Sequence, residues 1–206
     1  AEHEGGGLDV TPRVTWRPSP RYEFTVGPAF GLWTQPTRLL RRLPGTDGAR
    51  YLLATLRSAT TRLTVRANAA FSRTLTLQAY AEPFVGAGEH RAFRQVVAAG
   101  ARRWRDQFDW YDPGQVLRAD DRIAIDEDRD GVAEIDLGRP DYTALSFRSN
   151  LVLRWEYGPG SALFVVWQHG RALDRTEADF GFSGLAGLGA APAENRFLVK
   201  ASYWLN

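Results

Sequence analysis

The residues best suited to chemistry lie between positions 126 and 136, where carboxylates recur at alternate positions. Asp126, Asp128 and Asp130 are followed by Gly131, the spacing with which a calcium loop of the EF-hand type begins. Alternate side chains in such a turn converge on one hard cation, and the glycine permits the sharp bend. The candidate calcium ligands are three aspartates, one main-chain carbonyl and two later carboxylates: Asp126, Asp128, Asp130, Val132, Glu134 and Asp136.

The match to the EF-hand pattern is incomplete, because the twelfth position holds Leu137 in place of the bidentate glutamate. Glu134 or Asp136 would have to supply the missing carboxylate. A solvated acidic loop without any ion explains the same residues equally well. If calcium binds, we expect it to stiffen a surface loop and to take no part in catalysis.

No constellation of catalytic residues is visible elsewhere in the sequence. The three histidines, His3, His90 and His169, lack the spacing of metal ligands. The closest approach to a catalytic acid pair is a scatter of loop aspartates, Asp109, Asp112, Asp120 and Asp121. A nucleophile elbow, a phosphate-binding loop and a zinc motif are also lacking. The sequence therefore does not predict an enzyme, and it predicts no cofactor other than calcium.

The elements that carry these residues are predicted to be long strands with one apolar face. In the stretch 143–157, odd positions hold mostly apolar side chains, and even positions are mostly polar, with Val152 the large apolar exception. This period of two is typical of a strand with different faces. A turn at 158–160 leads into a returning arm, 161–171. Arms of ten or more residues exceed the usual strand length of about 5–6 residues, and they suit a tilted strand that crosses a bilayer.

The same alternation predicts further strands at 8–16, 21–32, 50–71, 74–85 and 196–206. Short turns are expected at 17–20, 72–73 and 158–160, and long connections at 34–49, 86–142 and 172–194. Within the longest connection, 93–104 is a candidate short helix. Treating 50–71 as one strand, not two, places every short turn at one end of the strands and every long connection at the other.

About seven strands of this kind predict an all-β fold, the antiparallel transmembrane β-barrel, with apolar side chains facing outward. Bacterial single-chain barrels have even numbers of strands, and unpaired edges cannot face lipid. We therefore expect residues 1–206 to be the C-terminal part of a larger barrel whose other strands precede Ala1. The connection 86–142 is then a long extracellular loop or a plug that carries the calcium loop, 126–136. An aromatic girdle beside the short turns is predicted from Trp16, Tyr22, Phe71, Trp155, Tyr157 and Tyr203.

The composition and charge of the chain narrow the range of partners that we expect it to bind. The chain of 206 residues has a net charge of +2 and no cysteine, and it has no apolar run of the ~18 residues that a membrane-spanning helix needs. Its arginines are scattered, so nucleic-acid binding is not predicted. Basic residues expected on the inward face are Arg13, Arg21, Arg62, Arg66, Arg148, Arg154, Arg196 and Lys200. With Glu23, Glu82 and Glu156 also inward, a salt-bridged interior is favoured over a basic lumen that attracts anions.

Four segments together resemble the C-terminal region of the domain-of-unknown-function 5916 family: LTLQAYAEPF at 75–84, FRSNLVLRWEY at 147–157, GSALFVVW at 160–167 and NRFLVKASYW at 195–204. The stretch 126–131 also resembles an Asp/Gly-rich segment of that family. The resemblance covers roughly residues 50–206 and carries no catalytic residues. One departure is the end of the chain, Leu205-Asn206, because many outer-membrane proteins end in an aromatic residue.

The resemblance implies a protein of the outer membrane of a Gram-negative-type bacterium, often with a carbohydrate-binding-like domain of family 9 upstream. We expect membrane lipid as a partner, and other outer-membrane or surface subunits are further candidates. The favoured function is passage or uptake of a solute, with a glycan as one candidate. The alternative is a structural barrel that docks a partner through its surface loops, and a soluble β-sandwich enzyme is the least favoured.

Overall fold

The computed structural model describes residues 5–45, 48–119 and 122–205. These residues form an all-β fold in which strand pairs are antiparallel, and the helical turns are short 3-10 segments. In the described part of the chain, no helix has the length and apolar character needed to cross a membrane. The expected all-β, antiparallel architecture is confirmed.

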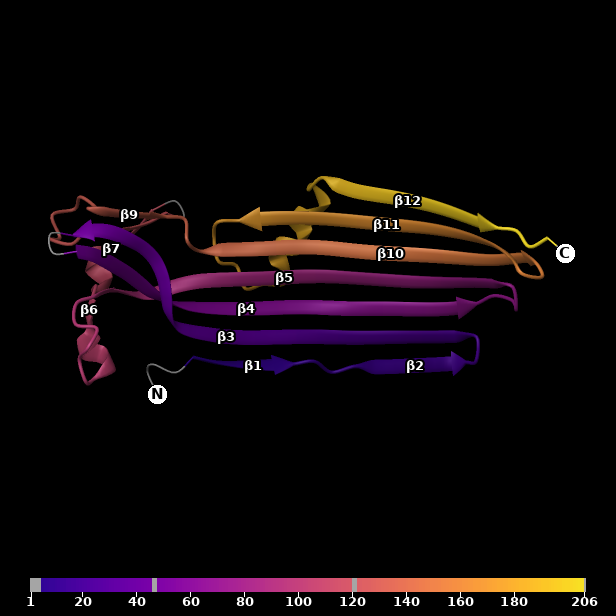
Figure 1. The fold of residues 1–206 in the computed structure, drawn as a ribbon, viewed down its shortest axis with the longest axis horizontal. Coiled ribbons are helices and arrows are strands. Elements are labelled where there is room, and N and C mark those ends of the chain that lie inside the picture. Colours follow the sequence, from indigo (N-terminus) through magenta and orange to yellow (C-terminus); the bar gives the residue numbers. More distant parts are fainter. Residues whose placement is uncertain (1–4, 46–47, 120–121, 206) are drawn as a thin grey trace.

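The main sheet is a meander of long strands whose order in space follows their order in the chain (Figure 1). Its strands are β1 (Gly6–Val10), β2 (Val14–Ser19), β3 (Tyr22–Gly45), β4 (Gly48–Ala70), β5 (Leu75–Val96), β10 (Tyr142–Gly158), β11 (Ser161–Arg175) and β12 (Ala193–Ser202). The short β6 (Phe108–Trp110) also belongs to this sheet and pairs with the end of β5. Because β1 and β2 both pair with β3, one after the other, they act as one interrupted line. The sheet therefore has seven strand lines, at the seven places that the sequence predicts.

The two ends of the meander differ as expected. The stretch 50–71 is one strand, β4, and the turns after β2, β4 and β10 lie together at one end of the sheet (Figure 1). The connections after β3, β5 and β11 lie at the opposite end. In the turn after β10, Gly160 has a φ of +73°, a conformation that glycine adopts without a steric penalty.

The prediction of a loop at 34–49 is wrong, because β3 and β4 continue there as a hairpin. The register shifts between Gln35 and Arg38 and again between Leu39 and Arg41, and each shift inserts one residue into β3. An inserted residue moves the following side chains to the opposite face. The period of two is therefore lost from the sequence although the strand continues.

The other two long connections are also shorter than predicted. β5 extends to Val96, so the connection before β10 begins there and not at residue 86. The predicted helix at 93–104 is wrong, since 93–96 are strand and only Trp104–Gln107 (η1) is helical. Likewise β11 extends to Arg175, and the rest of 172–194 contains η3 (Phe182–Gly189) before β12 begins.

One face of the main sheet is apolar across all seven lines. The register places one apolar side chain from each line in a single row: Trp16, Phe24, Ala67, Ala79, Leu151, Trp167 and Phe197. At the two edges these side chains are open to solvent, Trp16 by 62% and Phe197 by 72%. Near the long-connection end, η3 covers part of this face, where Leu188 and Ala191 pack on Val85 and Leu145.

A second, small sheet covers the opposite face at the long-connection end. It consists of β7 (Val116–Ala119), β8 (Arg122–Ile125) and β9 (Ile135–Gly138), after β6 (Phe108–Trp110) and η2 (Pro113–Gln115). Its core joins both sheets through Leu52, Ala54, Phe93, Tyr111, Ile123, Ile125 and Ile135. Because β4 contains no inserted residue, Leu52 and Ala54 lie on the same face as Arg62 and Arg66 of that strand. The second sheet therefore packs on the polar face.

We predict that Ile125→Ala loosens the second sheet, because the Ile125 side chain is fully buried in this core. A cavity of this size costs about 2–5 kcal/mol of unfolding free energy. Hydrogen–deuterium exchange of the β7–β9 amides should accelerate by more than tenfold. Val132→Ala, at an exposed loop position, should leave exchange unchanged. Equal exchange in Ile125→Ala and the parent would contradict the assigned core.

Candidate functional site

The acidic loop connects β8 to β9, and its ends are fixed by buried isoleucines, Ile125 and Ile135. Asp126 is buried, and its two carboxylate oxygens accept the backbone N–H groups of Arg129 (2.6 Å) and Gly131 (2.8 Å). Arg129 and Gly131 both have positive φ values, +66° and +92°. The loop thus turns sharply around the Asp126 carboxylate, as the Asp-Gly spacing predicts.

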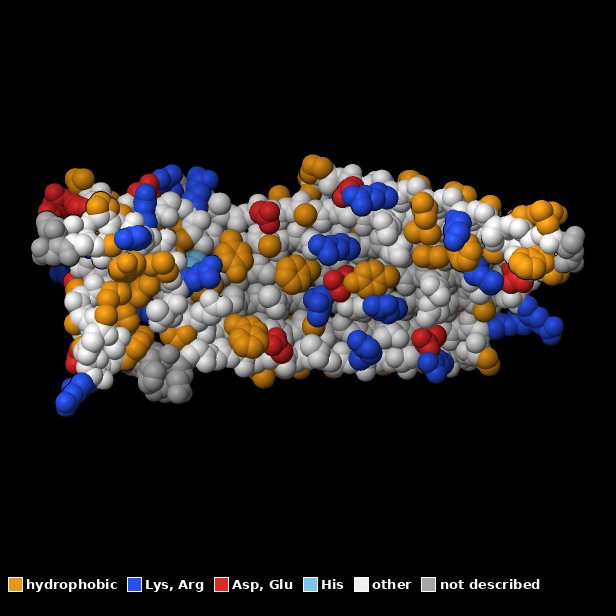
Figure 2. Space-filling model, viewed as in Figure 1, with side chains coloured by type: hydrophobic (Ala, Val, Ile, Leu, Met, Phe, Trp, Pro, Cys, Tyr) orange, Lys and Arg blue, Asp and Glu red, His pale blue; other side chains and the backbone are white. Residues whose placement is uncertain are grey.

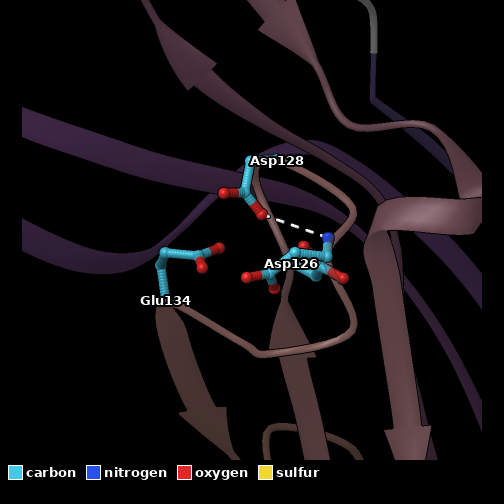
Figure 3. A group of neighbouring side chains, drawn as sticks. Asp126, Asp128 and Glu134 are labelled. Atoms are coloured by element: carbon cyan, nitrogen blue, oxygen red, sulfur yellow. Dashed lines mark hydrogen bonds between the residues drawn. The ribbon is translucent and has the colours of Figure 1, made fainter.

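Four carboxylates gather in this loop. Asp126, Asp128, Asp130 and Glu134 each place one oxygen within 4.8 Å of the others. Figure 3 shows Asp126, Asp128 and Glu134 around the turn of the loop. Oxygens that share one calcium ion at ~2.4 Å lie no more than about 5 Å apart, so the group has the dimensions of a calcium site. Mutual repulsion of carboxylates at this spacing would be relieved by a divalent cation.

The cluster is also held together by backbone hydrogen bonds. The carboxylate of Asp128 accepts the N–H of Asp130 (3.1 Å), and that of Asp130 accepts the N–H of Val132 (2.7 Å). Glu134 reaches back to the N–H of Glu127 (2.6 Å). Each carboxylate oxygen has lone pairs beyond those bonds, so the arrangement leaves oxygen atoms that can still coordinate a metal ion.

Asp136, the last of the predicted ligands, does not join the cluster. It lies in β9, forms an ion pair with Arg122 and accepts the N–H of Gly138 (2.8 Å). The hydrogen bond from Gly138 and the one from Arg122 lower the pKa of its carboxyl. Val132 lies in the loop with an exposed side chain. The structure therefore brings together four of the six predicted residues as side-chain donors.

Glu127, which the sequence does not single out, points away from the cluster into a network with Arg50 and Tyr111. It pairs with Arg50 and accepts the Tyr111 hydroxyl (2.8 Å). Hydrogen bonding from Arg50 lowers the pKa of Glu127, although partial burial opposes the charge, and burial raises the pKa of Tyr111. These bonds attach the acidic loop to the start of β4, which lies 77 residues earlier in the chain.

A second buried group joins β5, β7 and the start of β10. One oxygen of Asp141 lies 2.7 Å from the N–H of His90 and 3.1 Å from its Nδ1, and the other accepts Arg118 (3.0 Å). Burial opposes the charge on Asp141, but the hydrogen bonds from His90 and Arg118 give its carboxyl a lowered pKa. A carboxylate that orients a histidine occurs in nucleophilic catalysis. Within the described residues, however, no hydroxyl is hydrogen-bonded to His90.

The other residues considered for chemistry lie apart from one another. His169 sits at the edge of the apolar face, with Nδ1 2.9 Å from the Asn195 side-chain oxygen. Asp109 accepts a hydrogen bond from Gln95 (3.2 Å), and Asp112 pairs with Arg129. His3, Asp120 and Asp121 lie outside the described residues. Among the described residues, these side chains are not brought together into one group.

The polar face of the main sheet carries interspersed basic and acidic side chains (Figure 2). Several of the arginines predicted to face inward are ion-paired, as a salt-bridged interior requires: Arg62 with Glu82 (3.8 Å), Arg154 with Glu156 (2.9 Å), and Arg196 with Glu194. Arg66 instead lies over the ring of Tyr80, 5.0 Å from its centroid. The expected pairing is therefore present for part of the set only.

Comparison with models of known protein families, with curated proteins and with solved structures gave no match to this chain. The resemblance to the domain-of-unknown-function 5916 family therefore stays a prediction from the sequence.

We predict that acid opens the region 97–141. In the folded protein, the carboxyls of Glu127 and Asp141 have pKa values below those of free carboxyls. Their stabilisation is complete above those values and is lost as the pH falls through the lower folded values. The protection of amides in 97–119 and 122–141 against hydrogen–deuterium exchange, corrected for the intrinsic pH dependence of exchange, should therefore fall as the pH drops below about 4, where free carboxyls titrate.

The variant Glu127→Gln should exchange faster at neutral pH and respond less to acid, because it removes one of the two titrating groups. Asp106→Asn is the control, since Asp106 is an exposed residue of η1, and it should behave like the parent. Protection that is independent of pH across this range, after correction for the intrinsic exchange rate, would contradict the role assigned to these carboxylates.

Proposed function

We propose that the main sheet is part of a transmembrane β-barrel in a bacterial outer membrane, and that a solute passes along its polar face. In this proposal the apolar face contacts hydrocarbon and the polar face lines a water-filled interior. The observation that carries the proposal is where the apolar side chains lie along each strand. This apolar band shifts along the strand direction from one side of the sheet to the other.

The drift is largest between the two well-defined lines β3 and β12. On β3 the apolar face runs from Tyr22 to Leu32, whereas on β12 it begins only at Phe197, after Asn195. The register places Phe197 in the row of Phe24. The apolar band therefore moves toward the short turns as the sheet is crossed from β3 to β12.

This drift has the size expected for a membrane barrel. Averaged over both ends of the band, the shift is about six residues over the five steps from β3 to β12. With a rise of ~3.3 Å per residue and ~4.8 Å between strands, the band lies level with the membrane only if the strands tilt by roughly 40°. Strands of transmembrane barrels tilt by about 35–45°. The packing of a sheet in a soluble sandwich does not require an apolar band that becomes level only when the strands tilt by this angle.

Strand direction supports a larger barrel. Seven alternating lines leave β1 with β2 at one edge and β12 at the other, and these edges run in the same direction (Figure 1). Joining them directly would create a parallel pair, and so would a ring of two copies in the same orientation. An odd number of further strands gives antiparallel pairing throughout and an even total, as in single-chain bacterial barrels.

Aromatic side chains support the position of one membrane boundary. The six aromatics predicted as a girdle beside the short turns are all exposed, from Tyr22 at 36% to Tyr203 at 72%. In membrane barrels such residues mark the depth of the lipid headgroups. Their position supports a membrane interface at the short-turn end.

A docking barrel is the second candidate, favoured by the folded region at the long-connection end. The second sheet has its own core with the main sheet, and such an ordered surface is suited to a protein partner. Conductance in planar bilayers separates the candidates. Steady pores favour solute passage, and a sealed sheet that conducts no ions favours docking.

We predict opposite outcomes for two neighbouring aliphatic residues of β10. Leu151 lies on the apolar face in the row of Phe24, and Val152 lies on the polar face opposite Gln78. Arginine on the lipid face near mid-membrane costs about 2–4 kcal/mol, whereas a water-filled interior tolerates it. Urea unfolding of protein inserted in lipid vesicles should show this loss for Leu151→Arg and little change for Val152→Arg. Equal costs at both positions would contradict contact with hydrocarbon on one side only.

We also propose that the acidic loop binds calcium and thereby stiffens the connection between β8 and β9. The support is the approach of four carboxylates around a loop whose ends are anchored in a core. The residues that would hold the ion are Asp126, Asp128, Asp130 and Glu134.

The expected result is a calcium-dependent rise in melting temperature relative to EDTA. An ion present at 100 times its dissociation constant stabilises by about 2.7 kcal/mol. The double substitution Asp128→Asn with Asp130→Asn should abolish the rise. Asp136→Asn is the control and should keep it, because Asp136 lies outside the cluster. No rise in the parent, or loss of the rise in Asp136→Asn, would contradict the assigned ligands.

A further inference from the structure

The polar face is hollowed over β2, β3 and β4. The hollow has a volume of about 690 Å³, and basic side chains on β2 and β4 and the loop before β2 stand around it: Arg13, Arg17, Arg62 and Arg66. Threonines such as Thr25 and Thr64 add hydroxyl groups to its wall, and Glu23 is its one acidic residue. Its lining is therefore polar and strongly basic.

Small residues of β3 create this space. Gly27 pairs with Thr64 and Ala29 pairs with Arg62, so almost no side chain of β3 rises between the arginines. A methyl group added at Gly27 would lie 4.0 Å from Nε of Arg13. The guanidinium of Arg13 thus lies beside the floor of the hollow.

The positive charge of the hollow is only partly neutralised. Arg17 pairs with Glu23, and Arg62 lies 3.8 Å from Glu82. In the described part of the chain, Arg13 and Arg66 have no carboxylate partner, and Arg66 lies against the Tyr80 ring. A guanidinium that stacks on an aromatic ring keeps its in-plane N–H groups available for an anion.

We propose that this hollow binds an anionic group of a solute, a phosphate, sulfate or carboxylate. Guanidinium groups recognise such groups through paired N–H donors, and Arg13 and Arg66 are the two with unused charge. The proposal deepens the proposed function by naming the substrate class, and it rests on that function for the idea that the hollow lines a solute path. Binding itself does not require a membrane.

The first test is calorimetric titration of the full-length protein in detergent with tripolyphosphate at low salt. The double variant Arg13→Gln with Arg66→Gln should bind at least tenfold more weakly than the parent. The matched control is Arg102→Gln with Arg103→Gln, which removes the same charge from exposed positions before η1. It should bind like the parent, and unchanged near-ultraviolet circular dichroism should verify folding in both variants.

Equal affinity of the parent and Arg13→Gln/Arg66→Gln would overturn the proposal, and so would an absence of binding to the parent. Equally weakened binding in Arg102→Gln/Arg103→Gln would overturn it as well, because the net charge of the protein would then suffice to explain the affinity.

The second test measures the reversal potential in planar bilayers under a potassium chloride gradient. The parent should prefer chloride, and Arg13→Gln/Arg66→Gln should shift the reversal potential toward cation preference, with no shift in the control. Site-dependent binding without conductance would support the anion site and count against solute passage. If no variant changes the conductance and tripolyphosphate does not bind, the anion site is overturned, but the proposed barrel is not.

Discussion

Antiparallel pairing in a single register is the constraint on which the rest of the structure depends. Each strand line alternates apolar and polar side chains, and the backbone hydrogen bonds fix how those alternations add up across the sheet. A slip of one residue in any pair would mix arginines with valines on both faces. With the observed register, seven lines give one continuous apolar face and an opposite face that carries most of the charged side chains.

Departures from regular pairing occur where the two faces end. The inserted residues in β3 beyond Gln35, and the shift of β5 relative to β4 near Ala92, re-aim side chains so that a small apolar core forms on the otherwise polar side. This core anchors the acidic loop and the Glu127 network. On the other side η3 covers Leu145 and Val85. The long-connection end is thus folded on both faces, whereas the middle of the sheet is bare.

Much of the fold could be predicted because a single period governs the middle of every strand. The seven lines, the unity of β4 and the grouping of short turns all follow from alternation and turn residues. The hairpin at 34–49 and the end of β5 could not be predicted in this way, since bulges break the period there. Ala92 has a φ of +51°, which residue type alone does not reveal.

The candidate site was predictable to the extent that it is local. The Asp-Gly spacing predicts the turn around Asp126 and three of the four clustered carboxylates. It does not separate Glu134, which returns to the cluster, from Asp136, which pairs with Arg122 in the strand. The partners of Glu127 and Asp141 come from distant strands, and the hollow depends on how Gly27 and Ala29 align with β4. Such alignments follow from tertiary pairing and leave no local signal.

The central claim is that one face of this sheet meets hydrocarbon and the other meets water. The chain contains no cysteine, so single cysteines at successive positions from 150 to 156 of β10 can carry a spin label without background. In lipid vesicles, the accessibility of the label to oxygen should alternate with a period of two, highest at Leu151, Leu153 and Trp155, with the opposite alternation for a water-soluble nickel chelate. Labels at those odd positions that are reached by the nickel chelate, or by neither reagent, would contradict the account.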